Sequence, residues 1–220
     1  MIQIVVSDEM HRLCPEFVGV AIAARVENNL HSPELWKWID DFSKEYRVRY
    51  SFDSIKMMPA VRATREAYKR CGKDPSRYRP SGEALCRRIL RGLPLYQINT
   101  LVDLINVVSI ATGYSIGGFD ADLFEGNLLT LGIGTKGELY EGIGRGLLNI
   151  DRMPVYRDRC GGVGTPTSDN ERTKLSLETT KLLTIINGYS GHNGLGEAVQ
   201  MMQKLLKEFV KGEVTEISYF

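Results

Sequence analysis

An apolar segment between Tyr96 and Thr112 constrains the fold more than any other part of this sequence. Leucine, isoleucine, valine and alanine occupy nearly every angular position of a helix there, so almost no side of the helix is suited to water. We therefore expect this helix to be buried. At 220 residues with 43% hydrophobic content, the chain is long enough to build the core that would cover it.

Polar side chains interrupt this helix along one side only. Asn99, Asp103, Asn106 and Ser109 fall within about 120° of arc at about 3.6 residues per turn. Buried amides and carboxylates are costly unless they are paired. The stripe must therefore meet either the backbone of another segment or a polar ligand, and both interpretations stay open.

Helical and strand-like patterns alternate along the whole chain. Helical spacing and capping residues predict helices over residues 33–46, 60–71, 81–91, 96–112 and 194–212. Apolar and β-branched runs predict strands over residues 1–6, 17–26, 114–119, 127–134, 138–146, 154–158, 180–186 and 213–220. Residues 160–173 are predicted to form a loop. Since no linker or repeat divides the chain, we expect a single α+β domain over residues 1–220, with mixed β-sheets flanked by helices.

Positive charge is concentrated between Arg62 and Arg91. The whole chain carries +1, whereas this segment has ten basic and three acidic residues and carries +7 alone. A local cationic face attracts phosphate even when the molecule is nearly neutral. Within this segment Glu83, Arg87 and Arg91 recur every four residues, which is typical of a solvated, salt-bridged helix face.

Cysteine and histidine usage argues against a metal centre. The four cysteines are far apart with no CxxC, and the three histidines stand singly. We assign no metal and no cofactor, and we expect a reduced, cytoplasmic setting. The amino-terminal stretch lacks the basic region of a signal peptide, and no apolar run is long enough to cross a membrane.

Two short motifs are weak guides to function. Residues 113–117 satisfy GxSxG, and Asp169 and His192 follow in the order of a hydrolase triad, but the predicted helix precedes Ser115 and the strand follows it. A nucleophile elbow needs the reverse order. Residues 132–137 satisfy GxGxxG, but no helix is predicted after them, so we expect hairpin turns there.

Ordered sequence blocks carry a more specific signal. The blocks are DPSRYRPSGEALCRRILRG, INTLVDLINVVSIATGYSIGGFD, KGELYEGIG and GGVGTPTSDNERT. Over about residues 17–186 they resemble the tRNA-editing domain of the bacterial phenylalanyl-tRNA synthetase beta subunit and its freestanding single-domain relatives. VDLINVVS is similar to the VDxTNYV helix of that domain, GYSIGGFD to its GQPMHAFD turn, and Lys136-Gly137-Glu138 to its EGE turn. The resemblance implies an α+β domain that hydrolyses the ester of a mischarged tRNA without a metal.

Two polar groups that the resemblance associates with editing are replaced here. The turn of the synthetase has a histidine where this chain has Gly117, and its next pocket strand has a glutamate where TKLLTII has no acid. An aminoacyl ester is already activated, so hydrolysis needs a positioned water and donors for the oxyanion, which glycine backbone groups can supply.

We expect a pocket part over about residues 96–187 and an RNA-facing part over about residues 62–91. The polar stripe would form the pocket floor, and the pocket residues are Asn99, Asp103, Asn106, Ser109, Gly117, Gly118, Gly164, Thr165, Ser168 and Asp169. For Gly117 and Gly118 a tight turn is the alternative, and for the 161–168 loop a mobile surface loop. The RNA-binding residues are Arg77, Tyr78, Arg79, Arg87, Arg88, Arg91 and Arg172.

Three functions fit this sequence. The leading hypothesis is a freestanding hydrolase that deacylates mischarged aminoacyl-tRNA. The second is a non-catalytic RNA-binding module with the same fold, and the third is a protein that binds a small molecule or free amino acid in the same pocket. The expected partner is the aminoacyl end of tRNA, with no membrane and no DNA specificity.

Overall fold

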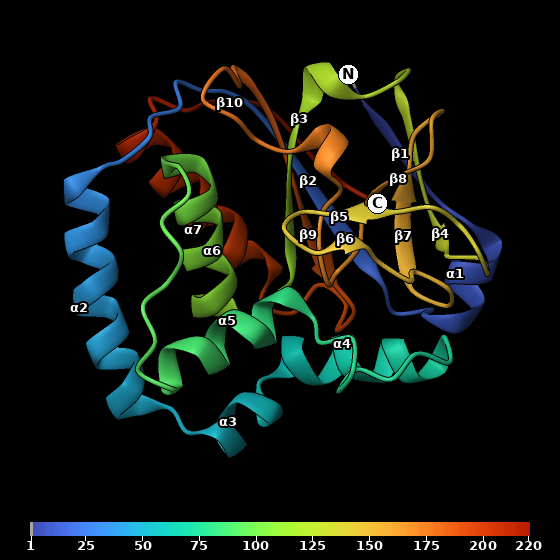
Figure 1. The fold of residues 1–220 in the computed structure, drawn as a ribbon, viewed down its shortest axis with the longest axis horizontal. Coiled ribbons are helices and arrows are strands. Elements are labelled where there is room, and N and C mark those ends of the chain that lie inside the picture. The colour runs from blue at the N-terminus through green and yellow to red at the C-terminus, as the bar shows by residue number, and fades with distance from the viewer. Residues whose placement is uncertain (1) are drawn as a thin grey trace.

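Two four-stranded sheets form the centre of the computed structural model, which describes residues 2–220 (Figure 1). The first sheet contains, in spatial order, β1 (Gln3–Val6), β4 (Leu128–Ile133), β7 (Pro154–Arg157) and β8 (Gly162–Gly164). The second contains β10 (Glu213–Tyr219), β2 (Val18–Arg25), β9 (Lys181–Gly188) and β3 (Ile116–Asp120). β1 runs parallel to β4, and the other neighbours are antiparallel. A short hairpin joins β5 (Glu141–Gly142) to β6 (Gly146–Leu147).

Helices cover the sheets on one side and below, and the short helix α1 (Asp8–Leu13) lies on the opposite side, beside β4 (Figure 1). The other helices are α2 (Pro33–Arg49), α3 (Phe52–Met57), α4 (Pro59–Arg70), α5 (Ser81–Leu90), α6 (Thr100–Thr112) and α7 (Leu195–Phe209). Two 3-10 turns, η1 (Ala121–Leu123) and η2 (Glu171–Thr173), lie in the connections. The α+β class with mixed sheets flanked by helices is confirmed.

Strands β2, β9 and β3 of the second sheet are largely buried because their side chains alternate between two hydrophobic clusters. Val20 and Ile22 of β2 pack toward α6 and α7, whereas Ala21 packs toward the first sheet. This arrangement explains why β2 is apolar at nearly every position. α6 lies inside the first cluster, so the expectation that this helix is buried is confirmed.

Several observed elements differ from the predicted ones. α6 begins at Thr100 instead of Tyr96, because the Asn99 side chain accepts a hydrogen bond from Val102 N at 3.0 Å and caps the helix. α1 and α3 were not predicted, since helices of six residues are too short to show a helical period. β8 lies within the predicted 160–173 loop.

The prediction that Glu83, Arg87 and Arg91 form a solvated face of α5 is wrong for Glu83. Glu83 is only 2% exposed, and Arg65, Arg79 and Arg87 surround its carboxylate. The first turn of α5 is buried because Gly82 approaches the connection between α6 and β3: a Cβ at Gly82 would lie 2.6 Å from Tyr114 O. The missing side chain lets the two backbones meet and covers Glu83.

Candidate functional site

A small cavity lies between the two sheets at the end where β3 and β8 approach each other. Its lining residues come from four strands and from the loop after β8, and they are Gly117, Phe119, Tyr156, Gly164, Thr165, Asp169, Ile185 and Asn187. The space between these atoms amounts to about 160 Å³, but none of it admits a water-sized sphere. The cavity is therefore too narrow to hold a water molecule.

Phe119 fills most of the space between two of the lining glycines. A Cβ added at Gly117 would lie 2.7 Å from Phe119 Cζ, and one added at Gly164 would lie 2.5 Å from the same atom. The absence of both side chains is thus what allows the ring to sit there. Gly117 and Gly118 pair with Ile185 and Thr184 within β3, so these glycines are strand residues and do not form a tight turn.

Asp169 supplies an ionisable group to this cavity. Its Oδ2 accepts a hydrogen bond from Gly118 N at 3.0 Å. Its Oδ1 would lie 3.3 Å from a Cβ added at Gly117 and 3.2 Å from one added at Gly164. Burial raises the pKa of Asp169 to about 7, although the Gly118 N–H acts in the opposite direction. A carboxyl that titrates near neutral pH inside a cavity has the properties of a general base.

The loop that carries Asp169 is closed by its own hydrogen bonds. Thr165 Oγ1 donates to Ser168 O at 2.9 Å and accepts from the backbone N–H groups of Thr167 and Ser168. The β5–β6 hairpin packs on this loop, since Ile143 N donates to Asp169 O at 3.0 Å. The structure therefore brings together Gly117, Gly118, Gly164, Thr165, Ser168 and Asp169 of the predicted pocket residues.

Two polar residues that line the cavity, Tyr156 and Asn187, were missed in the sequence. Tyr156 Oη donates to Asn187 Oδ1 at 2.8 Å, and Asn187 Nδ2 donates to Ser115 O at 2.9 Å. The signal for Asn187 was present, because it is the one amide that follows the apolar run of β9. Tyr156 lies on a short strand of four residues that gives no functional pattern.

The polar stripe of α6 meets structural partners elsewhere. Asp103 accepts hydrogen bonds from Trp36 Nε1 at 2.8 Å and from Ile98 N at 3.0 Å, and Ser109 Oγ donates to Tyr114 O. Asn99 caps the helix, and Asn106 is half-buried. None of the four lines the cavity, so the expected floor is formed by other residues.

The basic segment borders the loop that closes the cavity. Ser81 N donates to Pro166 O at 2.7 Å, Thr167 Oγ1 donates to Tyr78 O at 3.4 Å, and Tyr68 Oη lies 2.8 Å from Thr167 Oγ1. Lys73 Nζ lies 3.8 Å from the centre of the Tyr78 ring. Tyr78 is consequently joined, through Thr167, to the loop that carries Asp169, and Arg79 is the next residue in the chain.

The remaining predicted RNA-binding residues have separate surroundings. Arg77 and Arg91 are exposed. Arg88 donates to Pro94 O at 2.6 Å and stacks on Tyr96, with its guanidinium 3.8 Å from the ring centre. Arg172 contacts a different part of the molecule: it donates to Asp158 Oδ1 at 2.7 Å and to Leu123 O at 3.2 Å.

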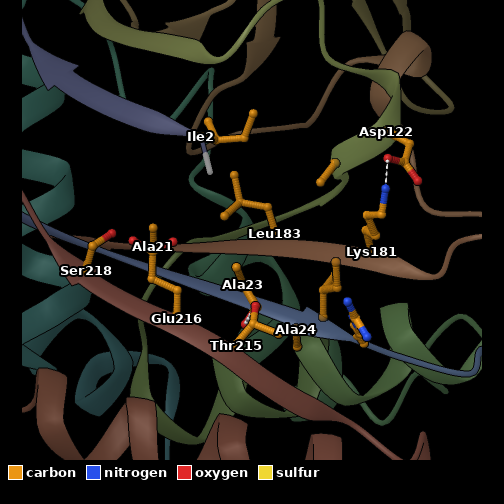
Figure 2. A pocket seen from close by; sticks show the side chains of 13 residues that line it. Ile2, Ala21, Ala23, Ala24, Asp122, Lys181, Leu183, Thr215, Glu216 and Ser218 are labelled. Carbon is orange, nitrogen blue, oxygen red and sulfur yellow. Dashed lines mark hydrogen bonds and ion pairs between the residues drawn. The ribbon is translucent and has the colours of Figure 1, made fainter.

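A larger hollow of about 490 Å³ opens between β1 and the second sheet (Figure 2). Ile2, Ala21, Ala23 and Leu183 form its apolar floor, and an ion pair between Lys181 and Asp122 lies at its rim. None of the predicted site residues lines it.

No group of three or more His, Cys, Asp or Glu side chains within residues 2–220 is arranged to hold a metal ion. No helix in the same range is long and apolar enough to span a membrane.

The fold and the cavity define an α+β domain in which a loop closes a cavity between two facing sheets. Residues 63–211, more than half of the chain, match the family model described as the B3/4 domain. The chain therefore belongs to the B3/4 domain family, the family of the editing domain found in the phenylalanyl-tRNA synthetase beta subunit. The resemblance inferred from the sequence blocks is confirmed.

A solved structure shares this fold. It is an N-terminal fragment of the phenylalanyl-tRNA synthetase beta subunit from Pyrococcus horikoshii, with a TM-score of 0.50 and 13% sequence identity. The similarity covers 97% of this chain and 50% of the solved one, so this chain spans half the length of that fragment. No curated protein matches the sequence significantly.

Proposed function

We propose that this protein binds the aminoacyl end of tRNA and hydrolyses the ester of mischarged aminoacyl-tRNA at the cavity that contains Asp169. The observation that carries the proposal is the contact between the basic segment and the cavity loop, through Ser81 and Pro166 and through Tyr78 and Thr167. A tRNA held by the arginines would bring its esterified end to this loop.

Asp169 has the chemistry that the reaction needs. Its pKa of about 7 leaves a large fraction of the carboxylate free to accept a proton from water at neutral pH. The N–H groups of the glycine-rich strand and loop are suitable donors for the oxyanion of the tetrahedral intermediate. Because the cavity admits no water-sized sphere, the β5–β6 hairpin that packs on the loop has to move before an ester can enter.

The experiment is a deacylation assay on a panel of tRNAs, each charged with a wrong amino acid. The protein is expected to accelerate hydrolysis for at least one member of the panel, and Asp169→Asn is expected to slow that rate by about 100-fold or more. Failure to accelerate any of them over buffer would refute the hydrolase proposal.

A non-catalytic RNA-binding module is the second candidate. Phe119 occupies the space between Gly117 and Gly164, and this closed packing favours a domain that has kept the fold without the reaction. That candidate predicts salt-dependent binding of uncharged tRNA without any deacylation. Binding that does not change with salt concentration would argue against it.

A further inference from the structure

A cluster of three arginines around one buried carboxylate lies at the start of α5. Glu83 Oε2 accepts a hydrogen bond from Arg65 Nη1 at 2.9 Å. Arg65 is further fixed by Ser76, whose Oγ lies 3.2 Å from Arg65 Nη2. Arg65 therefore neutralises Glu83 and is held on both sides of its guanidinium.

Arg79 and Arg87 are surplus charges in this cluster. Arg79 Nε lies 3.6 Å from Glu83 Oε1 and Arg87 Nη1 lies 3.8 Å from the same oxygen, which is too long for good hydrogen bonds. The Nε–H groups of both arginines are shielded from solvent and have no hydrogen-bond partner within residues 2–220. Two positive charges thus converge on a single, already neutralised carboxylate, and the side chains of Arg79 and Arg87, 35% and 20% exposed, remain accessible to a ligand in solution.

We infer that Arg79 and Arg87 form a phosphate-binding site, with Glu83 as the residue that positions both guanidiniums. A phosphate is the ligand of matching chemistry, because its oxygens accept several charge-assisted hydrogen bonds from paired guanidinium groups. Phe52 supports the site from the side, since its ring centre lies 5.1 Å from the Arg87 guanidinium carbon.

The position of the cluster suggests which phosphate it holds. Arg79 follows Tyr78 directly, and Tyr78 O accepts a hydrogen bond from Thr167 in the cavity loop. This assignment rests on the proposed function, in which tRNA is the source of the phosphate. A phosphodiester close to the esterified end of the tRNA would bind here. The site would then fix the distance between the RNA backbone and the cavity.

The test compares tRNA binding by Arg79→Ala, Arg87→Ala and a control, Arg47→Ala, at several salt concentrations. Arg47 carries the same charge, is exposed on α2 and forms no ion pair within residues 2–220. Arg79→Ala and Arg87→Ala are each expected to weaken binding by about 10-fold and to lower the salt slope by about 1, while the control changes binding by less than about 3-fold. Equal effects of all three variants would overturn the site.

Glu83→Gln separates positioning from simple charge. This change adds one positive charge to the cluster, so electrostatics alone predict tighter binding of tRNA. If Glu83 positions the arginines, binding becomes weaker instead, because the guanidiniums lose the charged carboxylate that holds them and face an amide with one acceptor oxygen in place of two. Tighter binding by Glu83→Gln would contradict the positioning role.

Inorganic phosphate distinguishes failure of this site from failure of the proposed function. Phosphate is expected to raise the unfolding temperature of the wild-type protein above that of a chloride control of equal ionic strength, and this increase is expected to vanish in the Arg79→Ala, Arg87→Ala double variant. That result would support the site even if no tRNA were deacylated. If the double variant is stabilised as much as the wild type, the site is refuted even if deacylation is observed.

Should either alanine variant fail to fold, Arg79→Lys and Arg87→Lys replace it. Lysine keeps the charge but lacks the planar fork, so binding is expected to fall by about 3-fold or more at unchanged charge. Unchanged binding by both lysine variants would again contradict the assignment.

Discussion

Asp169 accepts the N–H of Gly118 at 3.0 Å and so joins the loop after β8 to the strand β3. These two residues are far apart in the sequence, and their contact closes the end of the cavity. The same carboxyl faces the two glycines that make room for Phe119. The Asp169 side chain therefore closes the loop, supplies the ionisable group and contacts the place where the two sheets pack.

Asp169→Asn is predicted to stabilise the protein at high pH. The pKa of Asp169 is raised to about 7, so between about pH 4 and pH 7 the folded state keeps a proton that the unfolded state has released. Stability from this residue is consequently full below about pH 4, falls between about pH 4 and pH 7, and is lost above that range. Asparagine can still accept the Gly118 N–H, so the variant is expected to gain about 2–4 kcal/mol over the wild type at pH 8.

Urea unfolding of both proteins at pH 4.5 and pH 8 measures this difference. The two proteins are expected to be similar at pH 4.5, where Asp169 is protonated in the folded state. A variant less stable than the wild type at pH 8 would show that the carboxylate is not destabilised by its surroundings.

Gly164→Ala is predicted to destabilise the fold by about 1–3 kcal/mol, because the new Cβ would lie 2.5 Å from a Phe119 ring that is 1% exposed and cannot move away. Gly196→Ala is the matched control. Gly196 lies in α7 with no atom within 4 Å of an added Cβ, so alanine is expected to stabilise by about 0.5–1 kcal/mol. Denaturant unfolding checks both, and a neutral Gly164→Ala would contradict the packing described for Phe119.

Trp36→Phe is predicted to lower the free energy of unfolding by about 1–3 kcal/mol, since it removes the donor that binds Asp103 Oδ2 at 2.8 Å. Asp103 is 2% exposed, and burial already raises its pKa, so the lost hydrogen bond raises the pKa of Asp103 further. Affinity for tRNA is expected to stay the same. Weaker tRNA binding at unchanged stability would instead place this pair in the RNA site.

Arg172→Ala is predicted to cost about 2–3 kcal/mol of stability, because it leaves the Asp158 carboxylate, 1% exposed, without its cationic partner. Backbone N–H groups of Glu125, Cys160 and Gly161 still bind Asp158, which limits the loss. Lys174→Ala is the control, since its exposed ion pair with Glu171 contributes less than about 0.5 kcal/mol. Thermal unfolding of both variants provides the comparison, and equal losses would contradict the buried pair.

The sequence predicted the long elements well because their periods are strong. The apolar run of α6 and the proline at the start of α2 were visible as patterns. Gly72, with φ of 82°, follows the end of α4, as the sequence predicted. α1 and α3 were invisible because their stability comes from capping by Ser7 and Ser51 over only six residues.

The cavity was predicted only in part. Gly117, Gly164 and Asp169 were recognised through the ordered blocks, but the approach of Gly117 and Gly164 to the same Phe119 ring depends on how the two sheets face each other. Likewise, the burial of Glu83 depends on the missing side chain of Gly82 and on Arg65 from another helix. Spacing within one helix carries no information about such partners.

The rate of deacylation of a mischarged tRNA, measured against pH for the wild type and Asp169→Asn, tests the central claim most directly. The wild-type rate is predicted to rise with pH and to level off above about pH 7, as the carboxylate of Asp169 forms. The variant is predicted to be slower by about 100-fold at pH 7.5 while binding the same tRNA with similar affinity. Equal rates for the two proteins would contradict the assignment of the cavity as a hydrolytic site.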